Sequence, residues 1–245
     1  MRRPGFGETL VLTSALAMGL AGCTGDDEVD PTTERPIEGI TTDDGTVTFD
    51  HTLENGVVIR TEYSTDYAIK QWKITEPKTV NISLSVIPAE GESTDPAAAP
   101  LVFVEHLHAD VSLEATRVGF DGMKQDSMDD SIHGATQPGF LVTPDAPYQE
   151  VFSIEGYSET LISGWGFASG GSGASEISQE RLTEENLAKV GVVGNEFGLI
   201  FDIVTVDPAT GMYTKSDIIV DQFFIATEAY LDQQAAAAAA TTTLG

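Results

Sequence analysis

The feature that most constrains this fold is an alternation of apolar and polar residues with a period of two. In residues 80–86, Val, Ile and Leu occupy every second position, and Asn or Ser fills the positions between them. Successive side chains of a strand point to opposite faces, so this pattern is typical of a strand with one buried face. A longer run, residues 101–114, follows the same rule. In that run we expect one side to carry Leu101, Phe103, Leu107, Val111 and Leu113.

Other segments are rich in Val, Ile, Phe and Thr, the residues that pleated sheets favour. Two of them flank residues 207–211, where Pro208 comes early and Gly211 comes last, a composition typical of a hairpin turn. The strands that we expect are 46–50, 57–63, 67–75, 80–86, 101–114, 149–155, 196–206 and 212–225.

Helix signals are few. Thr183 precedes two glutamates and Leu187, and Gly191 follows, which indicates a short capped helix. The alanine run 235–240 can extend a helix that begins near Glu228. Many strands and one or two short helices predict an all-β fold, either an antiparallel β-sandwich or a barrel-like arrangement.

The charge of the chain limits its partners. Of 245 residues, 39 are Asp or Glu and only 12 are Lys or Arg, which gives a formal net charge of −27. Phosphate groups are contacted by Lys and Arg, so the composition argues against a nucleic-acid partner. Cations and neutral surfaces are the expected partners.

The single cysteine, Cys23, excludes an intramolecular disulfide and any site built from several cysteines. Two arginines open the chain and an apolar stretch follows at residues 10–20, which is too short to span a bilayer, since about 20 apolar residues are needed. The stretch ends in Leu20-Ala21-Gly22-Cys23, which resembles the lipobox of bacterial lipoproteins. The resemblance implies that residues 1–22 are a signal peptide and that Cys23 becomes the lipid-bearing first residue of the mature chain.

This resemblance also implies a place in the cell. Thr24 rather than Asp follows the cysteine, which in enterobacterial lipoproteins favours the outer membrane. We therefore expect a cell-envelope protein held to the membrane through lipid on Cys23. The expected organisation is signal peptide (1–22), acidic flexible spacer (23–44), single β-sandwich domain (45–230) and low-complexity Ala/Thr tail (231–245).

One group of residues suggests a metal site. His106, His108 and Asp110 occupy alternate positions of strand 101–114, so they project from one face. Imidazole nitrogens and a carboxylate at that spacing suit zinc, copper or iron. His133 follows in a loop-like stretch, 121–134, and can complete the set. The candidate ligands are thus His106, His108, Asp110 and His133, with zinc or copper as the expected metal.

The same stretch offers other cation ligands. Met123 and Met128 carry thioethers that suit copper(I). Calcium is a less favoured alternative, because hard oxygen ligands occur here at high density. The four carboxylates concerned are Asp121, Asp126, Asp129 and Asp130.

These observations favour a binding module over an enzyme, and they assign no catalytic residue. One alternative is a metal-dependent hydrolase or other metalloenzyme, in which the same residues leave a coordination position open to activate water. Another is a surface or structural lipoprotein without a metal site.

Overall fold

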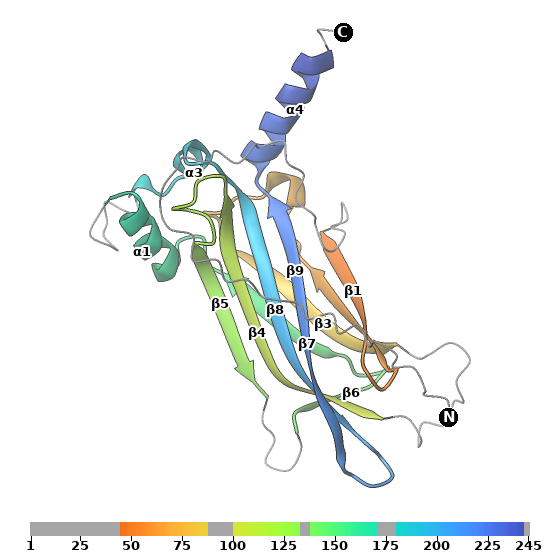
Figure 1. The fold of residues 1–245 in the computed structure, drawn as a ribbon. Coiled ribbons are helices and arrows are strands. Elements are labelled where there is room, and N and C mark those ends of the chain that lie inside the picture. The colour runs from red at the N-terminus through yellow and green to blue at the C-terminus, as the bar shows by residue number, and fades with distance from the viewer. Residues whose placement is uncertain (1–44, 88–99, 133–137, 171–179, 243–245) are drawn as a thin grey trace, which may run out of the picture.

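The protein is an antiparallel β-sandwich, as the alternation predicts (Figure 1). The computed structural model describes residues 45–87, 100–132, 138–170 and 180–242. The first sheet has the order β1 (Thr46–Thr52), β2 (Val58–Ser64), β3 (Lys78–Ile87) and β7 (Tyr148–Ile154). The second has the order β5 (Lys124–Ser131), β4 (Leu101–Ala115), β8 (Val192–Val206) and β9 (Tyr213–Ala226), and β6 (Phe140–Val142) also pairs with β4.

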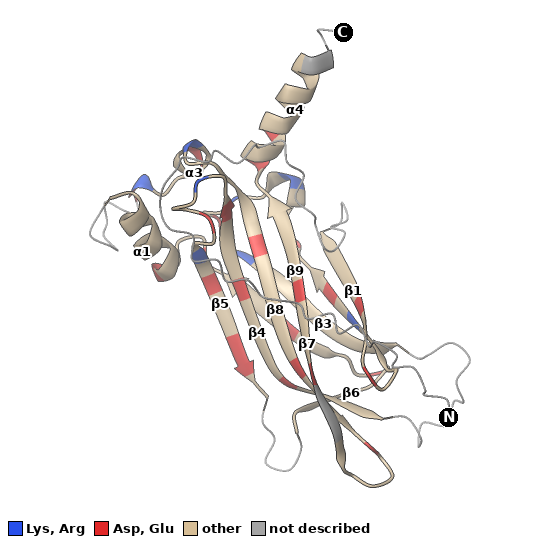
Figure 2. Ribbon diagram, viewed as in Figure 1, with Lys and Arg blue, Asp and Glu red and all other residues tan. Residues whose placement is uncertain are grey.

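The inner faces of the two sheets form one apolar core. On β3 the alternating Val80, Ile82 and Leu84 are buried, as expected. On the opposite sheet, Phe197 of β8 and Phe223 of β9 stack with ring centroids 4.7 Å apart. Acidic side chains remain on strands of both sheets, with few basic ones among them (Figure 2).

A β-bulge divides β4 into two parts. Its pairing with β8 shifts register between Val104 and His106, at the point where its other neighbour changes from β6 to β5. An extra residue in a strand reverses which positions face inward. Val104 and Leu107 are consequently both in the main core, whereas Phe103 packs in a separate small cluster with Val204. The expectation that Leu101 and Phe103 share the side of Leu107 is therefore wrong.

The strand predicted at 67–75 is also wrong. This segment contains a short 3-10 helix, η1 (Ile69–Gln71), followed by the buried Trp72 and Ile74. A segment can bury alternate side chains in the core without pairing with a strand. The apolar residues of this segment alternate because Trp72 and Ile74 are buried, and not because the segment is a strand.

Residues 121–134, expected to form a loop, contain β5. This strand was missed because it lies at the edge of its sheet and is rich in Asp and Ser. Its inward positions include Gln125, which is buried, and Met128, which packs against the core. An edge strand with so few apolar residues gives almost no alternation signal.

The helices gather at one end of the sandwich (Figure 1). The predicted capped helix is α3 (Glu184–Lys189), in which the Thr183 side chain accepts a hydrogen bond from the Asn186 amide. Helix α1 (Glu159–Ala168) was not predicted, and its cap is Ser158. Helix α4 (Glu228–Thr242) includes the alanine run, as expected. At the other end, the β8–β9 hairpin turns at Gly211, whose φ of 66° favours glycine.

Among the described residues, no helix has both the length and the apolar character needed to cross a membrane.

Lys78 is the most unusual buried group. Its side chain lies under the helical end of the sandwich, with Nζ 4.7 Å from the centre of the Trp72 ring and 5.7 Å from that of Tyr67. The residue is only 6% exposed. Burial lowers the pKa of Lys78 to about 8, although Glu184 and Glu76 act in the opposite direction. The folded protein therefore holds a poorly solvated positive charge at neutral pH.

We predict that Lys78→Met stabilises the protein at pH 7 by about 1–2 kcal/mol, because an apolar side chain of similar volume removes the cost of burying a charge. The folded state loses this proton at lower pH than the unfolded state does. The stability of the unsubstituted protein should therefore rise with pH from about 8 to the ordinary lysine pKa near 10.4, and the advantage of the variant should shrink in that window. Urea unfolding at several pH values measures this. The exposed Lys189→Met is the control, and an equal pH response in both variants would contradict the prediction.

Candidate functional site

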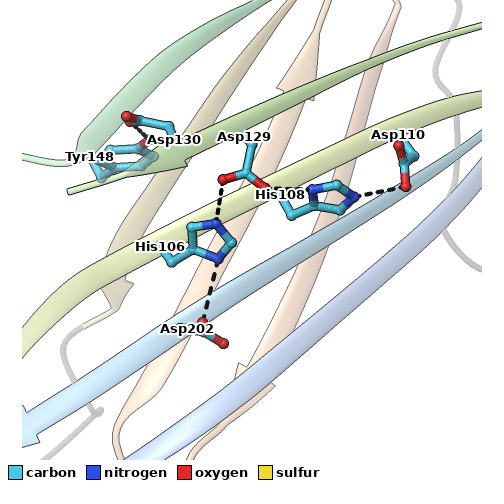
Figure 3. Close-up of polar contacts among 7 residues, drawn as sticks. All are labelled: His106, His108, Asp110, Asp129, Asp130, Tyr148 and Asp202. Atoms are coloured by element: carbon cyan, nitrogen blue, oxygen red, sulfur yellow. Dashed lines mark hydrogen bonds and ion pairs between the residues drawn. The ribbon is translucent and has the colours of Figure 1, made fainter.

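The outer face of β4 carries the three residues that the sequence singled out. His106, His108 and Asp110 project together from this face, and the intervening Leu107 and Ala109 are buried (Figure 3). The bulge before His106 sets this arrangement, because it gives His106 the outward direction that an unbroken alternation with Val104 would not allow. The prediction of a shared face is confirmed.

A fourth residue, Asp129 of β5, lies between the two imidazole rings (Figure 3). Antiparallel pairing places Asp129 opposite His108. Its Oδ1 is 2.8 Å from His106 Nε2, and its Oδ2 is 3.1 Å from His108 Nδ1. One carboxylate thus contacts both histidines, each through a different oxygen.

The remaining ring nitrogens also face carboxylates. His106 Nδ1 lies 3.4 Å from Oδ2 of Asp202, its register partner on β8. His108 Nε2 lies 2.8 Å from Oδ2 of Asp110. The other oxygen of Asp110, Oδ1, lies 2.5 Å from Nζ of Lys124. Acidic and basic groups therefore alternate across three neighbouring strands.

These contacts shift the pKa values of His106, Asp110 and Asp129. Only a doubly protonated imidazole has two N–H donors, so the carboxylates on both sides of His106 favour its cation. The hydrogen bond with Asp129 raises the pKa of His106, and the nearby charge of Asp202 adds to it. Hydrogen bonds with His106 and His108 lower the pKa of Asp129. Partial burial acts to raise the pKa of Asp110, but hydrogen bonds with Lys124 and His108 outweigh it, and the pKa falls.

The structure does not place every predicted ligand. His133 lies outside the described residues. Met123 and Met128 pack against apolar clusters rather than beside the histidines. In the described part of the chain, no group of three or more His, Cys, Asp or Glu side chains is arranged so that it could hold a metal ion. The imidazole nitrogens point at carboxylate oxygens.

The four carboxylates considered for calcium are not brought together. Asp129 faces outward, whereas Asp130 accepts a hydrogen bond from Tyr148, and Asp126 accepts one from the Glu155 amide. Asp121 accepts a hydrogen bond from the backbone of Ala115. Each carboxylate thus has its own structural contact.

Sequence reasoning missed the role of Asp129, as well as Asp202 and Lys124. Strand pairing brings Asp129 and Asp202 to the histidines and Lys124 to Asp110, and the register of β4 with its neighbours cannot be predicted from the local sequence pattern. The one available signal was that Asp129 lies on a short acidic segment with alternating polar residues.

No known protein family matches the chain, and no curated protein is significantly similar to it.

We predict that Asp129→Asn lowers the pKa of His106 toward its ordinary range, because the amide keeps the hydrogen-bonding oxygen and removes the negative charge. Since the folded-state pKa is raised, the His106–Asp129 pair contributes stability at acidic pH and loses it as pH rises through that raised pKa. An NMR titration of the imidazole nitrogens measures the change. Asp145→Asn, in an exposed turn, is the matched control, and an unaltered His106 titration in Asp129→Asn would refute the prediction.

Proposed function

We propose that this protein is a lipid-anchored binding module of the bacterial cell envelope that binds a transition metal through His106, His108 and Asp129. The observation that supports the proposal is the placement of one carboxylate between two imidazoles. Two histidines and one carboxylate are a recurrent ligand set for zinc and iron, and imidazole also suits copper.

Ion binding would require the side chains to move, because none of the groups in the described residues could hold a metal ion as it stands. Metal–ligand bonds of about 2.1 Å place adjacent ligand atoms about 3.0 Å apart in octahedral geometry and about 3.4 Å apart in tetrahedral geometry. The nitrogen-to-oxygen distances of 2.8 and 3.1 Å around Asp129 fall near the octahedral value. An ion would displace the protons that the two ring nitrogens present to Asp129, and small rotations of the rings would then turn the freed lone pairs toward an ion beside Asp129.

Two further carboxylates, those of Asp110 and Asp202, are placed to support histidines that bind a metal. A metal-bound histidine usually donates its other N–H to a carboxylate, which orients the ring and makes it a better ligand. Asp202 contacts Nδ1 of His106, and Asp110 contacts Nε2 of His108, which are the ring nitrogens that do not face Asp129. In our proposal Asp110 therefore supports His108 and is not itself a ligand, which revises the ligand set expected from the sequence.

The site faces solvent. The Asp129 side chain is 61% exposed, so an ion bound beside it keeps room for a further ligand. His133 follows β5 closely in the chain and is the first candidate for that position. The acidic surface raises the local concentration of cations and favours their capture.

We predict that the metal-free soluble domain, residues 24–245, binds one equivalent of Zn²⁺ or Cu²⁺ near pH 7.5. His106→Gln, His108→Gln and Asp129→Asn should each weaken binding by more than about tenfold, and Asp110→Asn and Asp202→Asn by about tenfold through the loss of their support. Calorimetric titration, with elemental analysis of the dialysed protein, measures affinity and stoichiometry. Affinity should also fall as pH is lowered, since protons compete for the same nitrogens.

His51→Gln is the matched control, because it removes a histidine from the opposite sheet. His133→Gln tests the fourth position. A domain that binds no stoichiometric metal, or that binds it equally well without His106 and His108, would refute the proposed site and leave an interaction protein without a metal.

The membrane anchor has its own test. If Cys23 carries lipid, expression of the full chain in bacteria should give a membrane-bound product that incorporates labelled fatty acid. Cys23→Ala should abolish labelling, because no other cysteine is present to take its place. Recovery of labelled Cys23→Ala would show that the lipobox interpretation is wrong.

A further inference from the structure

The outer face of the second sheet carries an exposed apolar patch next to β9. Ile218 and Val220 of β9 are 68% and 55% exposed, and Ile200 of β8 is 37% exposed. They adjoin one another, because Ile200 lies opposite Val220 in the strand pairing and Ile218 lies two positions before Val220 on the same face. The half-buried Phe224 continues the row along β9. These four residues, Ile200, Ile218, Val220 and Phe224, are called the β9 patch below.

The outer face of the first sheet has no comparable patch among its described residues. There β3 presents polar side chains at its outward positions, which are Thr79, Asn81, Ser83 and Ser85. In the described part of that sheet, Val151 is the one large apolar side chain that is exposed. Single apolar residues are normal on a protein surface, whereas adjoining ones favour the binding of another molecule.

The patch lies at an edge of its sheet. β9 pairs with β8 on one side and with no described strand on the other, where β1 of the first sheet lies nearby (Figure 1). Proteins usually protect such an edge with charged residues, proline or a bulge. The outward positions of β9 from 218 to 224 are Ile, Val, Gln and Phe, and the register with β8 is unbroken along them. This edge is therefore suited to pairing with a further strand.

The inner side of β9 is already occupied. Asp221 is 1% exposed, and its Oδ2 accepts hydrogen bonds from the hydroxyls of Thr61, at 2.6 Å, and Tyr63. Its Oδ1 lies 2.7 Å from Nε2 of His51 on β1. These contacts hold β9 against the first sheet, so its edge and its outer face are the parts that a partner can reach.

Acidic residues beside the β9 patch indicate the charge of a partner. On the outer face of β8, Asp202 lies opposite Ile218, and Glu196 lies opposite Phe224, so each end of the patch has a carboxylate next to it. The whole chain has a formal net charge of −27. A second copy of this chain would bring the same negative charge to the patch, whereas a basic segment would be attracted to it.

We propose that the free edge of β9 binds an extended, basic segment of another protein. The backbone of this segment continues the sheet beside β9. Its apolar side chains lie next to Ile218 and Val220, and its Lys or Arg side chains extend across β9 toward Asp202 and Glu196. Two strand spacings of about 4.8 Å separate the segment from β8, a distance that a long basic side chain and an acidic one together span. This binding requires neither histidine of the proposed metal site.

Binding of a synthetic peptide to the metal-free soluble domain tests the proposal. The peptide alternates lysine and valine, is capped at both ends and is long enough to span Ile218 to Phe224. In an NMR titration, the largest shifts should fall on the amides of β8 and β9. Hydrogen exchange of the β9 amides should slow when the peptide is bound, because a paired edge is protected from solvent. A peptide of the same length that alternates glutamate and valine should not bind.

Val220→Lys should weaken binding of the lysine–valine peptide by about tenfold, since it places a like charge in the β9 patch. Val151→Lys is the matched control, because it adds the same charge to an exposed valine of the first sheet and should leave the affinity nearly unchanged. Both valines are exposed, so neither substitution disturbs the core. The proposal is refuted if the peptide does not bind, or if it binds equally well to Val220→Lys. It is also refuted if sedimentation shows a dimer of the domain that Val220→Lys separates, because a second copy then covers the patch.

Discussion

The pairing of β4 with β8 along nearly its whole length is the constraint on which the rest of the structure depends. This central pair gives β4 one buried face and one outer face, and its two neighbours on the other side, β6 and β5, meet at the bulge. The bulge reverses the alternation between Val104 and His106. Apolar residues therefore continue into the core on both sides of it, while the histidines turn outward beside β5.

Polar groups inside the sandwich connect its layers at two places. Near the helices, the Trp72 indole donates to Asn195, whose amide donates to Gln125, which in turn donates to the carbonyl of Ile74. Along one side, Asp221 joins the sheets. Buried polar groups are expensive unless they are hydrogen-bonded, so networks of this kind favour one register of the sheets over others. The apolar core supplies the drive to collapse, and these contacts specify how the layers meet.

Imidazole and carboxylate groups meet in two different surroundings in this protein. Each places an imidazole nitrogen within hydrogen-bonding distance of a carboxylate. On the outer face the carboxylates stand on both sides of each ring and water reaches Asp129, which leaves space for an ion. Between the sheets, Asp221 is enclosed and is already bound by two hydroxyls, those of Thr61 and Tyr63. Solvent access distinguishes the two places.

Alternation by itself determined that the chain forms an all-β fold, which segments form most of its strands, and that His106, His108 and Asp110 share a face, because these properties depend only on the direction of neighbouring side chains. The choice of a sandwich over a barrel-like arrangement came from the tertiary structure. The lipobox likewise is a local pattern, and its prediction of a lipid on Cys23 awaits its test. Only the tertiary structure decided that residues 67–75 pack without pairing, that β5 exists, that a bulge turns β4, and that Asp129 rather than Asp110 lies between the rings. It also brought His51 to Asp221, 170 positions later in the chain. Each of these depends on strand register and sheet packing, which are set by the free energy of the whole core and not by any short stretch of sequence.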